Sequence, residues 1–189
     1  MSYLSTKLFF IIFVNKNIIT MEVIDFLCSR RSIRKYTLEK VSEELVSEIL
    51  KAGMYAPSAN NQRPWHFIVI RDKETLEAIT HIHPYSGMLH QASVAIVVCA
   101  DLDLEKSEGY WVQDCSNATQ NMLLAAHGLG LGAVWLGVHP RESRSKGIKE
   151  LFKLSDQIMP FSVISIGYPA EEKPFPERFD KQRIHYEKW

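Results

Sequence analysis

Four basic side chains surround the Ser32 hydroxyl in the segment 30–36, which has the sequence RRSIRKY. A phosphate monoester carries about −1.5 to −2 charges and three strong acceptor oxygens. Arginine presents a planar fork of donors that suits such a group, and serine adds a neutral donor. Arg30, Arg31, Ser32 and Arg34 are therefore candidate phosphate ligands. The alternative is an ordinary solvated helix end, where cations favour the C-terminal dipole.

A second cluster carries neutral hydrogen-bonding groups, in the sequence PSANNQRPW at 57–65. Amides and a hydroxyl at this density can read the edge of a heterocycle, which alternates carbonyls and ring nitrogens. The alternative is plain turn chemistry, because proline, serine and asparagine are common in turns. In either case the pattern predicts a loop between a helix and a buried strand.

A third cationic group lies in the tail, where Lys181 and Arg183 follow Arg178. On an extended chain, Lys181 and Arg183 project to the same side. They could bind the same phosphate as the first cluster. The alternative is a frayed, charged C-terminus.

Several other chemistries are excluded by order or spacing. The run GLGLGA at 128–133 matches a dinucleotide fingerprint only formally, because it follows a predicted helix and opens a strand. Of the seven histidines only His81 and His83 are close, and no HExxH occurs, so we expect no metal site. The three cysteines form no CxxC, which favours reduced thiols in the cytoplasm.

The composition is typical of one ordinary globular domain, with balanced positive and negative charge. The chain has 189 residues, 46% of them hydrophobic, and 22 basic residues balance 22 acidic ones. This balance gives no sign of nucleic acid or membrane as a partner. The apolar run at 8–14 is too short to cross a bilayer, which takes about 20 residues. We interpret 1–20 as an N-terminal extension outside the fold and 21–189 as the domain. The alternative is that 1–20 adds a strand or helix that packs on a partner subunit.

Periodicity and capping predict an α+β chain. We expect helices at 21–31, 41–55, 73–80, 110–127 and 141–154, and strands at 65–70, 93–100, 133–138 and 161–166. Ser42 is the expected cap of the second helix. The helix at 110–127 has a face of small residues, which we expect to permit close packing across a dimer.

Taken together, these segments resemble the FMN-dependent nitroreductase family, in its compact form. The resemblance covers about 21–189 and rests on the order and spacing of RRSIRKY, APSANNQRPWHFIVI, the segment 114–138, PFSVISIGYPAE and the closing KQRIHYEKW. It implies a three-layer α/β/α fold with a mixed central sheet. It also implies an intertwined homodimer with FMN bound at the subunit interface.

The resemblance also implies roles for particular residues. Arg30, Arg31 and Ser32 match positions that bind the phosphate and ribityl chain. Arg34 matches a cation near the flavin N1 and C2 carbonyl. Lys181 and Arg183 match a second pair of phosphate ligands. The loop that reaches the other subunit's flavin is matched by Pro57, Ser58, Ala59, Asn61 and Gln62. Leu136, Gly137 and Val138 match backbone near the flavin N5 and O4 edge.

The implied activity is the transfer of electrons from NADH or NADPH through FMN to a small acceptor such as a nitroaromatic or a quinone, in a ping-pong cycle. The cofactor carries this chemistry, so we assign no catalytic side chain. Many nitro-reducing members have an acidic residue in the stretch matching 136–138, whereas this chain has Gly137. The alternatives are a protein that stores FMN and a flavin enzyme of different outcome, such as a reductive dehalogenase.

Overall fold

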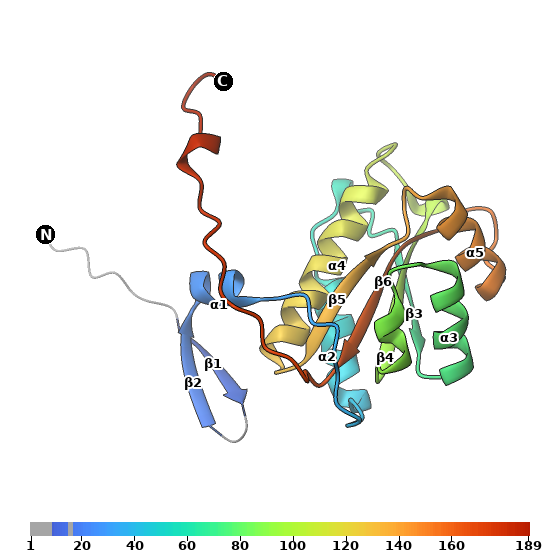
Figure 1. Cartoon of the computed structure of the whole chain (residues 1–189). Helices are drawn as coiled ribbons and strands as arrows, with labels where there is room; N and C mark the ends of the chain where they lie inside the picture. Colours follow the sequence, from blue (N-terminus) through green and yellow to red (C-terminus); the bar gives the residue numbers. More distant parts are fainter. Residues whose placement is uncertain (1–8, 15–16) are drawn as a thin grey trace, which may run out of the picture.

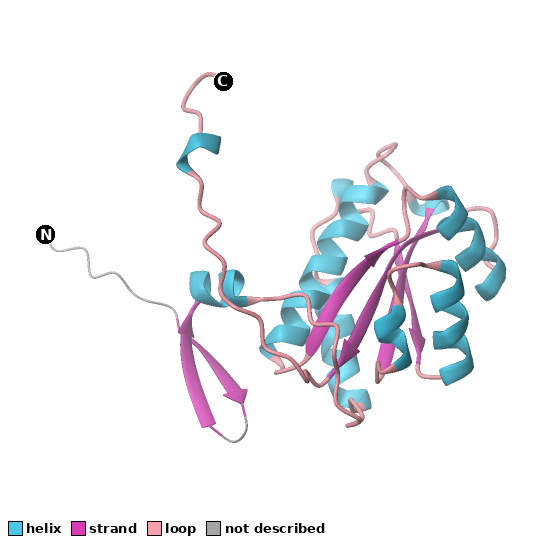
Figure 2. Ribbon diagram, in the orientation of Figure 1, coloured by secondary structure: helices cyan, strands magenta, loops and turns pink. Residues whose placement is uncertain are grey.

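The computed structural model describes residues 9–14 and 17–189. Its body is a four-stranded sheet between two layers of helices (Figures 1 and 2). The strands are β3 (Trp65–Ile70), β4 (Val94–Asp101), β5 (Gly132–Gly137) and β6 (Ile158–Gly167), in the order β3-β4-β6-β5. The helices of the body are α2 (Glu43–Met54), α3 (Lys73–Ile82), α4 (Trp111–Gly128) and α5 (Glu142–Phe152).

Successive side chains of β4 point to opposite faces of the sheet and pack against the two layers of helices. Val94, Ile96 and Val98 join the core beneath α2 and α4, whereas Ala95 and Val97 join the core beneath α3 and α5. Because both faces of β4 are covered by helices, the strand is apolar at every one of these positions. The predicted three-layer α+β architecture is confirmed.

The direction of the strands is less mixed than expected. Every neighbouring pair in the four-stranded sheet is antiparallel. The connection through α4 makes β4 and β5 point the same way, but β6 lies between them and pairs antiparallel with both. Among the described residues, the parallel pairing is an isolated bridge between Ser32 and Ala133, at the outer edge of β5.

The N-terminal part forms a hairpin that sequence reasoning did not predict. β1 (Phe9–Val14) pairs antiparallel with β2 (Asn17–Glu22), and α1 (Val23–Ser29) follows directly. Two apolar runs on either side of Asn15–Asn17 were the available signal. β2 runs across the expected boundary at residue 20, and the remainder of that extension, 1–8 and 15–16, lies outside the described residues.

The small-residue face of α4 is used within the chain, which corrects the expectation that it packs across a dimer. Cys115, Ala118 and Met122 on this face are fully buried. A Cβ added to Gly53 of α2 would lie 2.9 Å from Met122 Cγ, so the two helices approach closely here. Another surface must serve any subunit contact.

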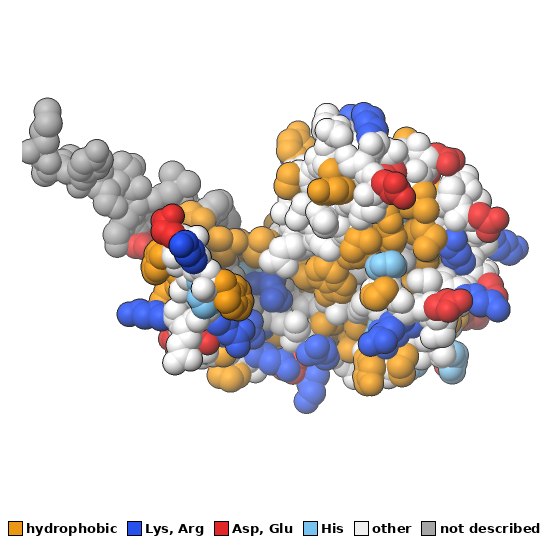
Figure 3. All heavy atoms as spheres, turned by 90° about the horizontal axis from the view of Figure 1, so that it is seen from above, with side chains coloured by type: hydrophobic (Ala, Val, Ile, Leu, Met, Phe, Trp, Pro, Cys, Tyr) orange, Lys and Arg blue, Asp and Glu red, His pale blue; other side chains and the backbone are white. Residues whose placement is uncertain are grey.

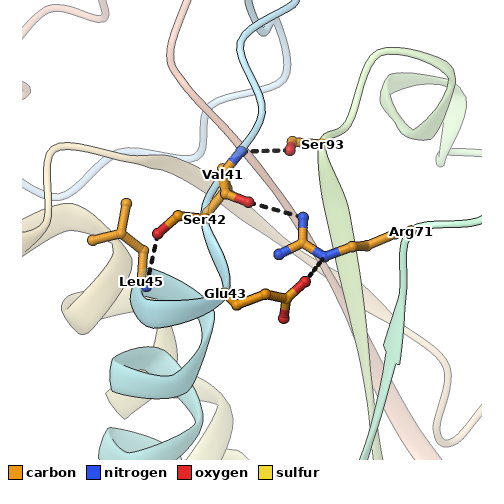
Figure 4. Close-up of polar contacts among 6 residues, drawn as sticks. All are labelled: Val41, Ser42, Glu43, Leu45, Arg71 and Ser93. Carbon is orange, nitrogen blue, oxygen red and sulfur yellow. Dashed lines mark hydrogen bonds and ion pairs between the residues drawn. The ribbon is translucent and has the colours of Figure 1, made fainter.

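Polar contacts fix the start of α2 against the sheet (Figure 4). Ser42 Oγ accepts from the Leu45 N–H at 3.4 Å, which confirms the predicted cap. Arg71 donates to the Val41 carbonyl at 2.9 Å and pairs with Glu43 at 2.9 Å. The Val41 N–H donates to Ser93 Oγ at 2.8 Å. The segment before α2 is thereby tied to β3 and β4.

The C-terminal segment leaves the body after a last pairing of Tyr36 with Pro169. From about residue 171 it runs away from the sheet past α1 and carries one short helical turn, η4 (Lys181–Arg183) (Figure 1). We call residues 171–189 the C-terminal arm. Phe175 and Phe179 on this arm are exposed, as is Trp189 at its end. No helix in the described part of the chain is long and apolar enough to cross a membrane.

Candidate functional site

A group of unneutralised cations lies where α1 meets the C-terminal arm. Arg30 and Arg178 line a cavity of about 200 Å³ there, with Leu27, Phe175 and Glu177 among its other walls. The pKa of Arg30 is lowered by burial first, and then by the positive charges of Arg178 and Arg31. Among the described residues, no carboxylate lies within ion-pair distance of Arg30. Such a site favours an anion.

Arg31 holds the arm against α1. Its Nε donates to the Pro174 carbonyl at 3.0 Å, its Nη1 donates to the Cys28 and Arg30 carbonyls at 2.8 Å each, and its guanidinium lies over the Phe175 ring at 5.0 Å. These bonds leave Arg31 only part of its donor capacity for a ligand. Its charge still adds to that of Arg30.

His127, at the end of α4, borders this cationic group and was not singled out by sequence reasoning. Its Nε2 lies 2.7 Å from Ser29 Oγ, and its ring stacks on Phe26 at 5.2 Å between centroids. Burial, followed by the charges of Arg30 and Arg31, lowers its pKa. The ring is thus less readily protonated than that of an ordinary histidine.

Ser32 and Arg34 lie at the beginning of β5. Ser32 bridges to Ala133, and the Ile33 N–H donates to the Ala133 carbonyl at 3.0 Å. The Arg34 side chain is exposed, while its backbone N–H donates to Glu171 Oε1 at 2.6 Å. That hydrogen bond is the main cause of the lowered pKa of Glu171. The Arg34 guanidinium therefore remains available to a ligand.

The loop at 57–63 has a strained backbone. Asn60, Asn61 and Arg63 all have positive φ angles, of 47°, 51° and 47°. Asparagine tolerates this region, but arginine rarely enters it. Such strain persists only where the surroundings enforce it, and it clusters at functional sites.

Buried hydrogen bonds enforce this loop conformation. Gln62 Nε2 donates to Asp114 Oδ2 at 2.5 Å, and Gln62 Oε1 accepts the N–H groups of Lys106 and Ser107 at 2.8 and 3.0 Å. The Ala59 N–H donates to Asp114 Oδ1 at 2.9 Å. Gln62 is buried, so its amide ties the loop to the body, whereas Pro57 and Asn61 are exposed.

The end of β5 offers accessible backbone. Leu136 and Val138 are buried, but a Cβ added at Gly137 would meet no atom within 4 Å. The N–H groups of Val138 and His139 both donate to the Phe161 carbonyl, at 3.1 and 3.0 Å. The strand end is therefore held in place while one side of Gly137 is open.

One chain does not bring all of these residues together. The loop at 57–63 and the end of β5 lie at the same end of the sheet, because Asp114 binds the loop and Trp111, one turn earlier in α4, contacts His139 at 4.7 Å between rings. Ser32 pairs with Ala133 at the opposite end of β5. At about 3.3 Å per residue, the length of this strand puts the two groups more than about 13 Å apart.

Arg178 is the arm cation that lies beside Arg30, while the role of Lys181 and Arg183 as phosphate ligands stays a prediction. Lys181 and Arg183 are exposed, and Arg183 pairs with Asp180 at 3.1 Å. None of the hydrogen bonds or ion pairs among the described residues joins either side chain to the segment 30–34. In the described chain, no cluster of three or more histidine, cysteine or acidic residues could hold a metal ion.

Comparison with known proteins defines the class to which this fold and site belong. The model of the nitroreductase family matches residues 27–83 and 80–168. The chain belongs to the nitroreductase family.

Individual relatives agree. A Methanothermobacter thermautotrophicus protein with the provisional name NADH dehydrogenase/NAD(P)H nitroreductase is 56% identical over 169 residues, which cover 89% of this chain and 88% of the relative. The solved FMN-dependent nitroreductase of Clostridium difficile R20291 matches with a TM-score of 0.82 at 36% identity, over 88% of this chain and 100% of that one. A provisionally named Desulfovibrio desulfuricans nitroreductase, solved in complex with FMN, matches with a TM-score of 0.78 at 35% identity, over 88% of this chain and 97% of that one.

Proposed function

We propose that this protein is an NAD(P)H-dependent FMN oxidoreductase, which passes electrons to a small acceptor such as a nitroaromatic or a quinone. The observation that carries the proposal is the partly buried Arg30, with Arg31 and Arg178 close by and no carboxylate paired with it in the described chain. An arrangement of like charges at a partly buried site is unfavourable unless an anion binds there. The FMN complex of a 35% identical relative supports FMN as that anion.

The residues present fit FMN in the chemistry of their donors. Arg30 and Ser32 offer charged and neutral donors for the phosphate and ribityl chain, with Lys181 and Arg183 as the second pair of phosphate ligands. The exposed guanidinium of Arg34 suits the flavin N1 and C2 carbonyl. Pro57, Ser58, Ala59 and Asn61 would contact the flavin, while Gln62 would act by holding their loop. Leu136, Gly137 and Val138 would supply backbone.

Bound FMN would supply the redox chemistry, accepting a hydride from NADH or NADPH and then reducing the acceptor. The chain's own residues would bind, orient and polarise the cofactor. A fixed cation at Arg34 would stabilise the negative charge that reduction places near N1 and C2=O, an effect worth on the order of 3 kcal/mol in comparable sites. No side chain needs to move a proton, so none is assigned as catalytic. A ping-pong order follows if the nicotinamide and the electron acceptor bind in turn at the same face of the flavin.

The family resemblance implies a homodimer in which each flavin is shared. In such a dimer the cationic segment of one chain would meet the loop at 57–63 of the other. The exposed Phe175 and Phe179 suit an arm that packs on a second copy. Seen from above, lysine and arginine side chains gather on and beside the protruding part of the molecule (Figure 3).

The test is the flavin content of the purified protein. We expect a yellow protein with one FMN per chain, which sediments as a dimer. A colourless protein that takes up no added FMN would contradict the proposal. A protein that keeps FMN but whose flavin neither NADH nor NADPH reduces would be an FMN store instead.

A further inference from the structure

The carbonyl oxygen of Gly137 receives two side chains from the layer of α3 and α5. Arg144 of α5 donates to it from Nη1 at 2.7 Å, and His83 Nε2, from the end of α3, lies 3.0 Å away. His83 is 3% exposed. The Arg144 guanidinium also lies over the Tyr85 ring, at 5.7 Å. A strand-end carbonyl with two donors, one of them a guanidinium, is strongly held.

The other contacts of His83 decide which nitrogen carries its proton. The Tyr85 N–H donates to Nδ1 at 3.2 Å, so Nδ1 must be the acceptor. The proton of the neutral ring is then on Nε2, from which it is donated to Gly137. Arg144 Nη1 lies 3.1 Å from the same nitrogen. In this tautomer Arg144 and His83 are two donors that converge on one oxygen.

The peptide that follows Gly137 is consequently fixed at both ends. Its carbonyl accepts from Arg144 and His83, and its N–H, on Val138, donates to the Phe161 carbonyl at 3.1 Å. Glycine has the most freedom of any residue, and Gly137 has open space beside it. Side chains from elsewhere must therefore supply the rigidity that this position lacks.

We propose that Arg144 and His83 are positioning residues, which hold the Gly137–Val138 peptide in the orientation that meets the cofactor. The inference rests on the proposed function, in which the flavin N5 and O4 edge approaches 136–138. Misplacement of a reacting group by about 1 Å can cost about 100-fold in rate. The two side chains would thus control the rate of flavin reduction without touching the flavin.

The first experiment compares Arg144→Met with Lys146→Met in the full-length protein. Both remove one positive charge from α5, but Lys146 is exposed and pairs with Glu150 at 3.9 Å. We expect amide hydrogen exchange at Val138 and His139 to be about tenfold faster in Arg144→Met than in Lys146→Met, because a charge-assisted bond is lost. We also expect reduction of bound FMN by saturating NADH or NADPH to slow by about tenfold or more, at unchanged FMN content.

The second experiment uses His83, in case Arg144→Met folds poorly. Glutamine can present an amide N–H near the position of Nε2, so His83→Gln should keep the wild-type exchange and reduction rates, whereas His83→Leu should show the Arg144→Met behaviour. Rescue by glutamine is not expected of a side chain that only fills space.

Each other outcome overturns the inference. Unchanged exchange at Val138 would show that the two side chains do not hold the peptide. Faster exchange with an unchanged reduction rate would leave them a purely structural role. Loss of FMN from Arg144→Met alone would make Arg144 a cofactor ligand. A wild-type protein without FMN would remove the proposed function and the positioning role with it, while exchange would still report whether the peptide is held.

Discussion

Arg30 and Arg34 differ in the charge that each would meet. Arg30 is partly buried beside Arg31 and Arg178, and it is assigned to a phosphate whose charge is the same in oxidised and reduced flavin. Arg34 is exposed and is assigned to N1 and C2=O, where negative charge appears only on reduction. A contact that is stronger in one state shifts the equilibrium towards that state.

Substitution should separate the two roles. Arg30→Ala should weaken FMN binding in both redox states, by about 1.5–3 kcal/mol. Arg34→Ala should lower the reduction potential of the bound flavin more than it weakens the binding of oxidised FMN. The measurements are an FMN-binding titration and a redox titration, with the neighbouring exposed Lys35→Ala as the control. If Arg34→Ala loses FMN but keeps the wild-type potential, Arg34 is a phosphate ligand.

His127 should report on an anion at the cationic site. Its pKa is lowered by burial and then by Arg30 and Arg31, so a bound anion that offsets these charges should raise it. NMR titration of the histidine ring in the flavin-free protein, with and without inorganic phosphate, would measure the change. The pKa of His139, which is lowered by burial alone, should not move. An equal shift of both rings would point to a general salt effect.

At the scale of elements, the loop at 57–63 depends on Asp114. This buried carboxylate accepts from Gln62 and from the Ala59 N–H, and it is 2% exposed. Asp114→Ala should leave both donors without a partner and destabilise the protein by about 1–3 kcal/mol. Urea denaturation would measure this, with Gln113→Ala, at an exposed position of the same helix, as the control. Equal stability of the two variants would contradict this account of the loop.

Local pattern predicted the elements of the body well. The strand at 65–70 begins and ends as expected, and Ser42 caps α2. Both predictions rest on patterns of residues that are close together in the sequence. The hairpin β1–β2 was missed because the apolar run at 8–14 was judged by its length for a membrane span. The partner of the small-residue face on α4 was misjudged, since sequence cannot show that Gly53 of α2 fits against it.

The candidate site residues could be selected from the sequence, but their contacts could not. Clusters such as 30–34 stand out because charge and donor type are visible in sequence. The internal role of Gln62, and the contacts of His83 and Arg144 with Gly137, depend on residues far along the chain. Such contacts arise only when the sheet and its helices have assembled.

For the whole molecule, mild acid should be destabilising. Burial is the main cause that lowers the pKa values of His83, His127 and His139 from their ordinary value of 6.5. The unfolded chain therefore binds more protons than the folded one below about pH 6.5. The contribution of these neutral rings to the free energy of unfolding is fully present above about pH 6.5, and it is lost as the pH falls through the lowered pKa values of the folded protein.

Urea denaturation at roughly pH 7.5 and pH 5.5 would measure this loss, and the double variant His83→Gln with His127→Gln should show a smaller one. His83→Gln retains a donor, so its effect on stability at the higher pH should be small. A flat profile between the two pH values would contradict the assignment of these rings as neutral.

The C-terminal arm should decide assembly as well as cofactor binding. Deletion of residues 171–189 removes the exposed Phe175 and Phe179, together with Arg178, Lys181 and Arg183. We expect the shortened protein to sediment as a monomer and to lose FMN. A shortened protein that remains a dimer with one FMN per chain would show that the arm serves neither purpose.

The most direct test of the central claim is anaerobic mixing of the purified protein with NADH or NADPH, followed by a nitroaromatic or a quinone. We expect the yellow absorption of bound FMN to bleach on addition of the nicotinamide and to return on addition of the acceptor, with one acceptor turnover per flavin for each two electrons. FMN that stays oxidised with both nicotinamides, in a protein that holds it at one per chain, would contradict the claim that this protein is an NAD(P)H-dependent oxidoreductase.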